Sequence, residues 1–208
     1  MTFERGKDTY SNVTVNGRQL GLPPKVRSGQ ELSQYLISQG QQGMWHLTEF
    51  GSNLMMIFRG ASQTIFTPRG EATIAGVRAS VFDFDIEQVH SPFQFLWAKS
   101  SKSPQWSPST EEQVAYYGVE GSVWVAEGTS RLIRIELNAT DLTPNFPIRS
   151  MSMATNYDVV SIGDAGGFLL PVVSESMECI RGENRCYRDV LEFRNCRKFG
   201  AKSRMVTQ

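Results

Sequence analysis

Apolar and polar side chains alternate along much of the second half of the chain. The clearest run covers residues 133–137, where charged residues separate apolar ones: Ile133, Ile135 and Leu137 stand around Arg134 and Glu136. A period of two gives a strand one apolar and one polar face. The β-forming run 121–126 precedes it, and Gly128 in the connection accepts the positive φ that tight hairpins need. The pattern predicts an antiparallel hairpin over residues 121–137.

Further runs that are rich in β-forming residues and bounded by turn residues predict more strands. They cover residues 61–67, 71–74, 76–86, 91–97, 148–162, 167–180, 186–195 and 199–206. Pro68–Gly70 and Asp141–Pro147 have turn composition and are expected to connect strands. Pro171 has no N–H group for a ladder hydrogen bond, so we expect its strand to be an edge strand or to bulge at that residue.

Two segments have the three- and four-residue spacing of helices instead. Ser28–Glu31 has the form of a capping box, and apolar residues follow it at helical spacing. The second and stronger segment runs from Trp45 to Phe58 and is expected to end at Gly60. Its apolar stripe consists of Leu47, Phe50, Gly51, Leu54, Ile57 and Phe58. We expect this helix to bury its stripe against a sheet face.

The fold class that these elements predict is α+β, with a curved antiparallel β-sheet and one or two helices against it. A chain of 208 residues suits a single domain over 1–208. A domain of this size buries roughly 70% of its unfolded surface, so its core needs no metal or disulfide.

Charge and composition exclude several classes of partner. The chain has 21 basic and 21 acidic residues, and this balance argues against nucleic acid, which usually needs a basic surface. No apolar run of eighteen residues occurs, so no transmembrane segment is expected. Cys179 and Cys186 flank a polar, turn-like segment, which leaves two alternatives, a disulfide or two half-buried thiols. The spacing of cysteines and histidines does not match a structural zinc site.

The common motifs of catalytic sites are missing from the sequence, and we expect no enzyme. Asp83 and Asp85 project from the same strand face, roughly 7 Å apart by strand rise. They are either a glycosidase-like pair or part of a solvated outer face, and the second interpretation is favoured. His90 and Cys196 suggest a base and a nucleophile, yet nothing in the sequence places them together.

A large aromatic content in the predicted sheet is the most informative feature for function. The apolar residues that would lie between the sheet and the helix are Leu54, Phe58, Phe82, Phe84, Phe93, Phe95 and Trp97. Aromatic side chains bury on the order of 150–250 Å² each when they are enclosed. The space between the two elements is then either packed solid or left as an apolar binding site.

Several segments, in this order, resemble a family of uncharacterised exported proteins of acidobacterial type. They are TEFGS at 48–52, IAGVRASVFDF at 74–84, GSVWVA at 121–126 with RLIRIE at 131–136, FLLPV at 168–172, and FRNCRKF at 193–199. That family in turn resembles, more distantly, the LolA-like lipoprotein-sorting half-barrels of the bacterial envelope. The resemblance implies a strongly curved antiparallel β-sheet, a half-barrel, wrapped on one or two helices. It also implies a periplasmic or secreted protein that sometimes holds acyl chains. It also implies that an export signal and further N-terminal residues precede Met1 in the native protein.

The leading hypothesis is a non-enzymatic extracytoplasmic protein that binds an apolar ligand, a lipid or a lipoprotein moiety between sheet and helix. The alternative is a structural or interaction module of the cell envelope with a solidly packed core. That module would contact a protein partner through its sheet edges or the loop around Trp106. A hydrolase that uses Asp83 and Asp85 is the third and weakest hypothesis. None of the three needs a cofactor.

Overall fold

A computed structural model gives the fold. It describes residues 51–98, 112–163, 166–182, 184, 186–194 and 196, together with short pieces at 2–4, 7–9, 14–15, 18–19, 21–23, 31 and 35. The predicted strand over 199–206 and the Trp106 loop lie outside the described residues. Of the predicted helix that follows Ser28, Glu31 and Tyr35 are described, and both are helical.

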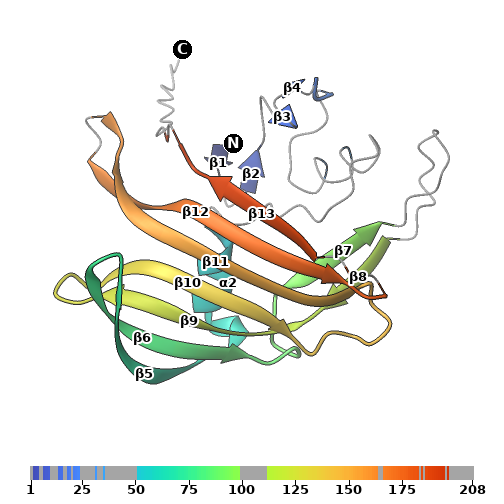
Figure 1. Ribbon diagram of the computed structural model, residues 1–208, viewed down its shortest axis with the longest axis horizontal. Helices are drawn as coiled ribbons and strands as arrows, with labels where there is room; N and C mark the ends of the chain where they lie inside the picture. Colours follow the sequence, from blue (N-terminus) through green and yellow to red (C-terminus); the bar gives the residue numbers. More distant parts are fainter. Residues whose placement is uncertain are drawn as a thin grey trace, which may run out of the picture.

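A seven-stranded antiparallel sheet is the main element (Figure 1). Its strands, in spatial order, are β5 (Ile65–Ile74), β6 (Val77–Ile86), β9 (Gly118–Ala126), β10 (Arg131–Thr140), β11 (Ile148–Ser161), β12 (Gly167–Ile180) and β13 (Cys186–Glu192). The order follows the chain except for a hairpin between β6 and β9, formed by β7 (Gln94–Ala98) and β8 (Glu112–Tyr116). Within the described residues β5 and β13 are the sheet edges, so the sheet is open and not a closed barrel. The predicted α+β class with an antiparallel sheet is confirmed.

Smaller elements complete the described part of the chain. Two short hairpins lie near the N-terminus, β1 (Thr2–Glu4) with β2 (Lys7–Thr9) and β3 (Thr14–Val15) with β4 (Arg18–Gln19). Helix α2 (Ser52–Phe58) and the 3-10 turn η1 (Gly60–Ser62) precede β5. Within the described residues, no helix combines the length and apolar character that crossing a membrane requires.

Helix α2 packs against one face of the sheet, behind β10 and β11 in Figure 1. Ile57 is fully buried there, and Asn53 donates from Nδ2 to Met153 Sδ on β11 at 3.3 Å. The helix ends at Phe58, as predicted, but Gly51 does not belong to it, because Gly51 is the N-cap and the helix begins at Ser52. Residues 45–50 lie outside the described part. Ser62 Oγ donates to the Met56 carbonyl at 2.6 Å, which satisfies one of the backbone acceptors that a helix end leaves open.

The face that α2 covers, the helix-side face, carries the main core. Its buried members are Ile57, Phe84, Ile86, Phe93, Phe95, Tyr117, Val119, Val123, Ile135, Leu137, Phe146, Ile148, Met151, Met153 and Tyr157. Strand register explains part of this set, because Phe84, Gly121 and Leu137 are successive cross-strand partners. The ring of Phe84 lies directly over Gly121, where a Cβ atom would be 2.7 Å from Phe84 Cζ.

The predicted turn at Pro68–Gly70 is wrong. Strand β5 continues through it with a bulge between Pro68 and Gly70, and the turn to β6 lies at Ala75–Gly76. Because β5 is an edge strand, half of its N–H groups have no ladder partner, and a proline is tolerated there. Gly70, with φ of 127°, accepts the backbone conformation of the bulge. The predicted strand at 61–67 also begins later, at Ile65, after η1.

The hairpin of β9 and β10 is confirmed, with Ala126 opposite Arg131. One detail of its pattern is wrong, because a bulge between Leu132 and Arg134 interrupts the period of two. Ile133 therefore leaves the helix-side face and packs with Ala79 and Ala126 on the opposite, outer face. Leu132 takes its place against the main core.

The expected irregularity at Pro171 is confirmed. Pro171 pairs with Tyr157 beside a register shift between Asn156 and Tyr157. The pairing of β12 with β13 begins only at Val173. On its β13 side Pro171 therefore has no strand neighbour, and its missing N–H group breaks no ladder hydrogen bond there.

Candidate functional site

The structure brings three of the candidate apolar residues into one core. Phe84, Phe93 and Phe95 are only 3–4% exposed. The Phe95 ring stacks on Tyr117 with centroids 4.2 Å apart and on Phe146 at 5.6 Å. This part of the space between the main sheet and the β7–β8 hairpin is filled by the protein's own side chains.

The other candidates lie nearer the surface. Leu54 and Phe82 are partly buried and pack against the main core, whereas Phe58 is 54% exposed. Trp97 lies in β7, and its side chain is outside the described part of the structure.

Phe58 belongs to a row of three phenyl rings that leads from the surface into the core. Its ring stacks on Phe66, with centroids 5.4 Å apart, and Phe66 meets Phe84 at 6.1 Å. Exposure falls from 54% at Phe58 to 39% at Phe66 and 3% at Phe84. We call Phe58, Phe66 and Phe84 the aromatic row. Phe66 was not among the predicted site residues, because its strand carries no clear alternation around it.

A second feature of the helix-side face is polar. Ser174, Ser176 and Glu178 on β12 are 1–2% exposed, and we call them the polar row. Thr155 Oγ1 on β11 lies 2.9 Å from Ser174 Oγ in a hydrogen bond. Within the described part of the chain, Ser176 Oγ finds no hydrogen-bond partner. On β13, Asp189 lies directly opposite Ser176.

Burial shifts the ionisation of two groups on this face. It raises the pKa of the Tyr117 hydroxyl, and the negative charge of Glu178 adds to the effect. It also raises the pKa of the Asp189 carboxyl. Tyr117 therefore stays uncharged near neutral pH, and the surroundings of Asp189 disfavour a negative charge.

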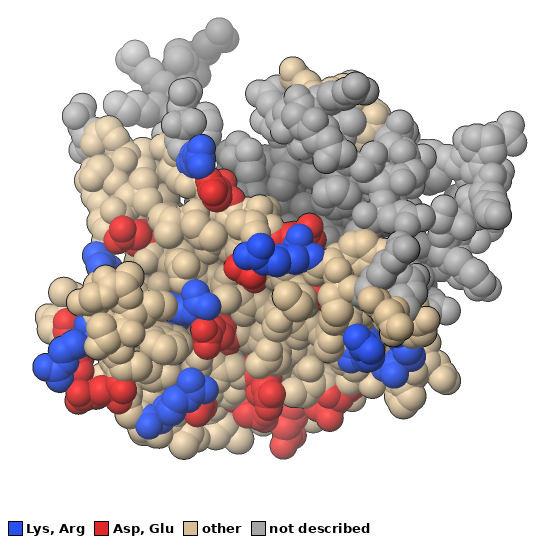
Figure 2. All heavy atoms as spheres, viewed as in Figure 1, with Lys and Arg blue, Asp and Glu red and all other residues tan. Residues whose placement is uncertain are grey.

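The outer face is polar, and many of its groups bind one another. Arg134 donates to Glu136 at 2.7 Å and to Asn156 at 2.6 Å, while Trp124 Nε1 donates to Ser122 Oγ at 3.0 Å. Figure 2 shows basic and acidic residues side by side at several places on this face, with a group of acidic residues along its lower edge. Such a surface gives little preference for a highly charged partner.

The residues considered for catalysis lie apart from the helix-side core. Asp83 forms an ion pair with Arg69, as expected for a solvated outer face. His90 Nδ1 lies 3.8 Å from a Glu87 carboxylate oxygen, and Cys196 is a free thiol. Among the described residues, no group of three or more His, Cys, Asp or Glu side chains is arranged to hold a metal ion.

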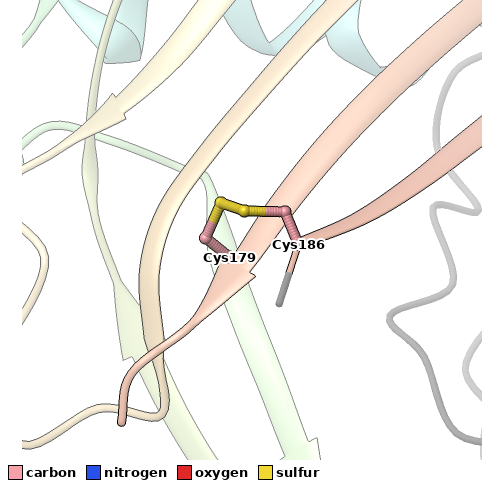
Figure 3. Close-up of a disulfide and its surroundings, with 2 residues drawn as sticks. All are labelled: Cys179 and Cys186. Atoms are coloured by element: carbon pink, nitrogen blue, oxygen red, sulfur yellow. A yellow bond between two sulfur atoms is a disulfide. The ribbon is translucent and has the colours of Figure 1, made fainter. Parts of the chain in front are cut away.

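Cys179 and Cys186 are joined by a disulfide, shown in Figure 3. They are register partners at the ends of β12 and β13, so the bond ties the edge strand β13 to the sheet. Arg188 on β13 donates to Glu175 at 2.6 Å across the same two strands and lowers the pKa of that carboxyl.

No protein-family model, curated protein or solved structure matches this chain. The resemblance to exported proteins and to LolA-like half-barrels therefore stays a prediction from the sequence.

Proposed function

We propose that this chain is a non-enzymatic, extracytoplasmic binding protein that holds an apolar ligand between its sheet and α2. The ligand class is an acyl chain, carried by a free lipid or by a lipoprotein. In this proposal the sheet curves around the helix as a half-barrel, and the aromatic row forms one end of the contact surface.

The exposed end of the aromatic row is the observation that supports the proposal. Phe58 and Phe66 leave 54% and 39% of their surfaces exposed, next to the core residue Phe84. At roughly 200 Å² per ring, a ligand would cover roughly 190 Å² there, which is about 4–5 kcal/mol. That free energy alone corresponds to a dissociation constant near 1 mM, so tighter binding needs further contacts along the helix-side face.

The disulfide supports the proposed location. Disulfide bonds persist in oxidising compartments and are rare in the reducing cytosol. The bond between Cys179 and Cys186 therefore favours the periplasm or the cell exterior.

Native mass spectrometry after gentle extraction, combined with displacement of a fluorescent fatty acid, tests the proposal. We expect a co-purifying lipid mass and saturable displacement. The double variant Phe58→Ser and Phe66→Ser should weaken probe binding at least tenfold. Val190→Ser is the matched control, because Val190 is 49% exposed on β13 and lies away from the aromatic row. No bound lipid and no displacement would contradict a carrier function.

The second candidate function is an interaction module of the cell envelope with a filled core. The close stacking of Phe95 on Tyr117 and Phe146 favours it, because these rings leave no room for a ligand between them. In that case the wild-type protein would co-purify with a protein partner and carry no lipid. The same double variant would then lose the partner, and the control would keep it.

A further inference from the structure

Strand β13 lies at one edge of the main sheet and packs loosely against the rest of it (Figure 1). All seven of its residues, Cys186–Glu192, belong to the described part of the chain, and they alternate between exposed and half-buried. Burial of apolar side chains is the main force that stabilises a strand in a fold, so β13 gains little from it. The other edge strand, β5, differs because its Phe66 ring contacts both Phe58 and the buried Phe84.

The non-covalent contacts between β13 and β12 are also weak. Arg188 forms an ion pair with Glu175, but both side chains are exposed, and exposed ion pairs contribute little to stability. On the helix-side face, the pairing of the strands places Asp189 beside Ser176. Burial raises the pKa of the Asp189 carboxyl, and the buried Ser176 hydroxyl has no hydrogen-bond partner among the described residues. Both groups would gain from contact with water, so they favour separation of the two strands.

The disulfide between Cys179 and Cys186 links β13 to β12 covalently, at the end of the ladder next to the turn (Figure 3). The two cysteines are seven residues apart in the sequence. With the bond in place, this end of the hairpin stays closed even when the rest of β13 has left the sheet. Without it, the chain alone must close the turn, which makes pairing of β13 roughly fiftyfold less favourable in the chain-entropy model.

The two cysteines differ in their access to solvent, because Cys186 is exposed and Cys179 is only 8% exposed. The thiolate of a dithiol reductant would therefore attack Cys186 Sγ, form a mixed disulfide there and release Cys179 as a thiolate that takes up a proton. The second thiol of the reductant then attacks its own sulfur in the mixed disulfide and releases Cys186. One dithiol thus supplies both electrons and both protons, and it ends as a disulfide itself.

We propose that β13 is a redox-controlled edge strand. The disulfide keeps it on β12, and reduction by a dithiol allows it to leave while the other six strands of the main sheet stay folded. In an oxidising compartment the strand is paired, and a reductant is needed to release it. Its departure opens the edge of β12 along Val173–Cys179, where backbone N–H and C=O groups become free to pair with another strand. The inference concerns the edge of the sheet and does not depend on the proposed ligand.

Hydrogen–deuterium exchange of the whole protein, read by mass spectrometry of its peptides, tests this inference. The oxidised protein is compared with protein that dithiothreitol has reduced in the absence of denaturant, at the same pH. We expect the protection of the β13 amides to fall roughly fiftyfold on reduction. The amides of β9 and β10, which lie in the middle of the sheet, should change less than about threefold.

Two variants separate the loss of the bond from side effects of the reductant. The double variant Cys179→Ser and Cys186→Ser should show the exchange pattern of the reduced protein without any reagent. Cys196→Ser is the matched control, because Cys196 is a free thiol outside β12 and β13, and it should keep the wild-type exchange pattern in both redox states. Both variants should still unfold cooperatively in urea, since the remaining strands keep their core.

Two outcomes would overturn the inference. If the β13 amides keep their protection after complete reduction and in the double variant, other contacts are sufficient to keep the strand in place. If all strands lose protection together, the disulfide stabilises the whole fold and β13 is not a separate unit. Neither outcome affects the lipid-binding assays, so the proposed function would stand if this inference failed.

Discussion

Replacing Ile57 by alanine tests whether apolar contacts hold α2 on the sheet. Ile57 is 0% exposed and belongs to the main core, which it joins from the helix. The change removes three methyl or methylene groups, which amounts to about 2.4 kcal/mol of transfer free energy. A cavity left by incomplete relaxation adds to this, so we expect the free energy of unfolding to fall by about 2.5–4 kcal/mol.

Met55→Ala is the matched control, two residues earlier on the same helix. Met55 is 54% exposed, and alanine is a slightly better helix former, so we expect a change below about 1 kcal/mol. The measurement is urea unfolding of the disulfide-bonded protein, followed by tryptophan fluorescence and circular dichroism. Both variants should keep the wild-type denaturant dependence, because that slope reflects the surface exposed on unfolding.

Equal decreases in the free energy of unfolding for Ile57→Ala and Met55→Ala would refute the reasoning. They would mean that the side of α2 on which Ile57 lies has no special contact with the sheet. The proposal of a ligand between the two elements would then lose its basis, because the helix would not define one wall of the site.

Three other substitutions test the sheet itself. Gly121→Ala should lower the free energy of unfolding by about 1–3 kcal/mol in urea titrations, since its Cβ would overlap the backbone carbonyl oxygen of Glu136 and the Phe84 ring. An unchanged midpoint would show that both the ring and the neighbouring strand β10 shift easily. Glu120→Lys should raise the free energy of unfolding by about 0.2–1 kcal/mol, because Glu120 lies opposite Asp85 and the change removes a repulsion between two carboxylates. Added salt should reduce this gain, and a gain that does not depend on salt would exclude charge as its cause. Asp189→Asn should raise the melting temperature more at pH 7 than at pH 4. The pKa of Asp189 is raised in the folded protein, so ionisation of this carboxyl destabilises the fold once the pH rises above its pKa in the unfolded chain. An equal change in melting temperature at both pH values would contradict this.

Local sequence patterns were sufficient to predict most of the sheet. The hairpin of β9 and β10 and the long strands β11 and β12 agree with the structure because each combines β-forming residues with a nearby turn. Apart from the pairing of β9 with β6, their neighbours in the sheet are also their neighbours along the chain, so the local sequence was enough to predict these pairs.

Two of the errors lie at bulges. A period of two assumes an uninterrupted ladder, and one inserted residue moves each following side chain to the opposite face. The bulge beside Ile133 therefore places the side chain of Ile133 on the outer face, and the bulge at Pro68–Gly70 allows a proline inside a strand. Both depend on the neighbouring strand, which the local sequence does not contain.

The candidate site was predictable only in part. Phe84, Phe93 and Phe95 are buried in the core, as large aromatic residues usually are, while Phe58 turned out to be largely exposed. The polar row was missed because serine and glutamate at every second position usually indicate a solvated face. In residues 173–178 both faces of β12 carry polar residues, so composition gave no sign of which one is buried.

The burial of the polar row carries a free-energy cost for the fold. Ser174, Ser176 and Glu178 are 1–2% exposed, so they have lost most of their contact with water. Covering them with apolar groups alone would cost about 1–3 kcal/mol for each unsatisfied hydroxyl and more for the carboxyl. Ser174 avoids this cost through Thr155, whereas Ser176 has no such partner among the described residues. The protein's own atoms already cover these residues, so the unsatisfied hydroxyl of Ser176 is a cost that the fold itself bears, and other contacts in the core must offset it.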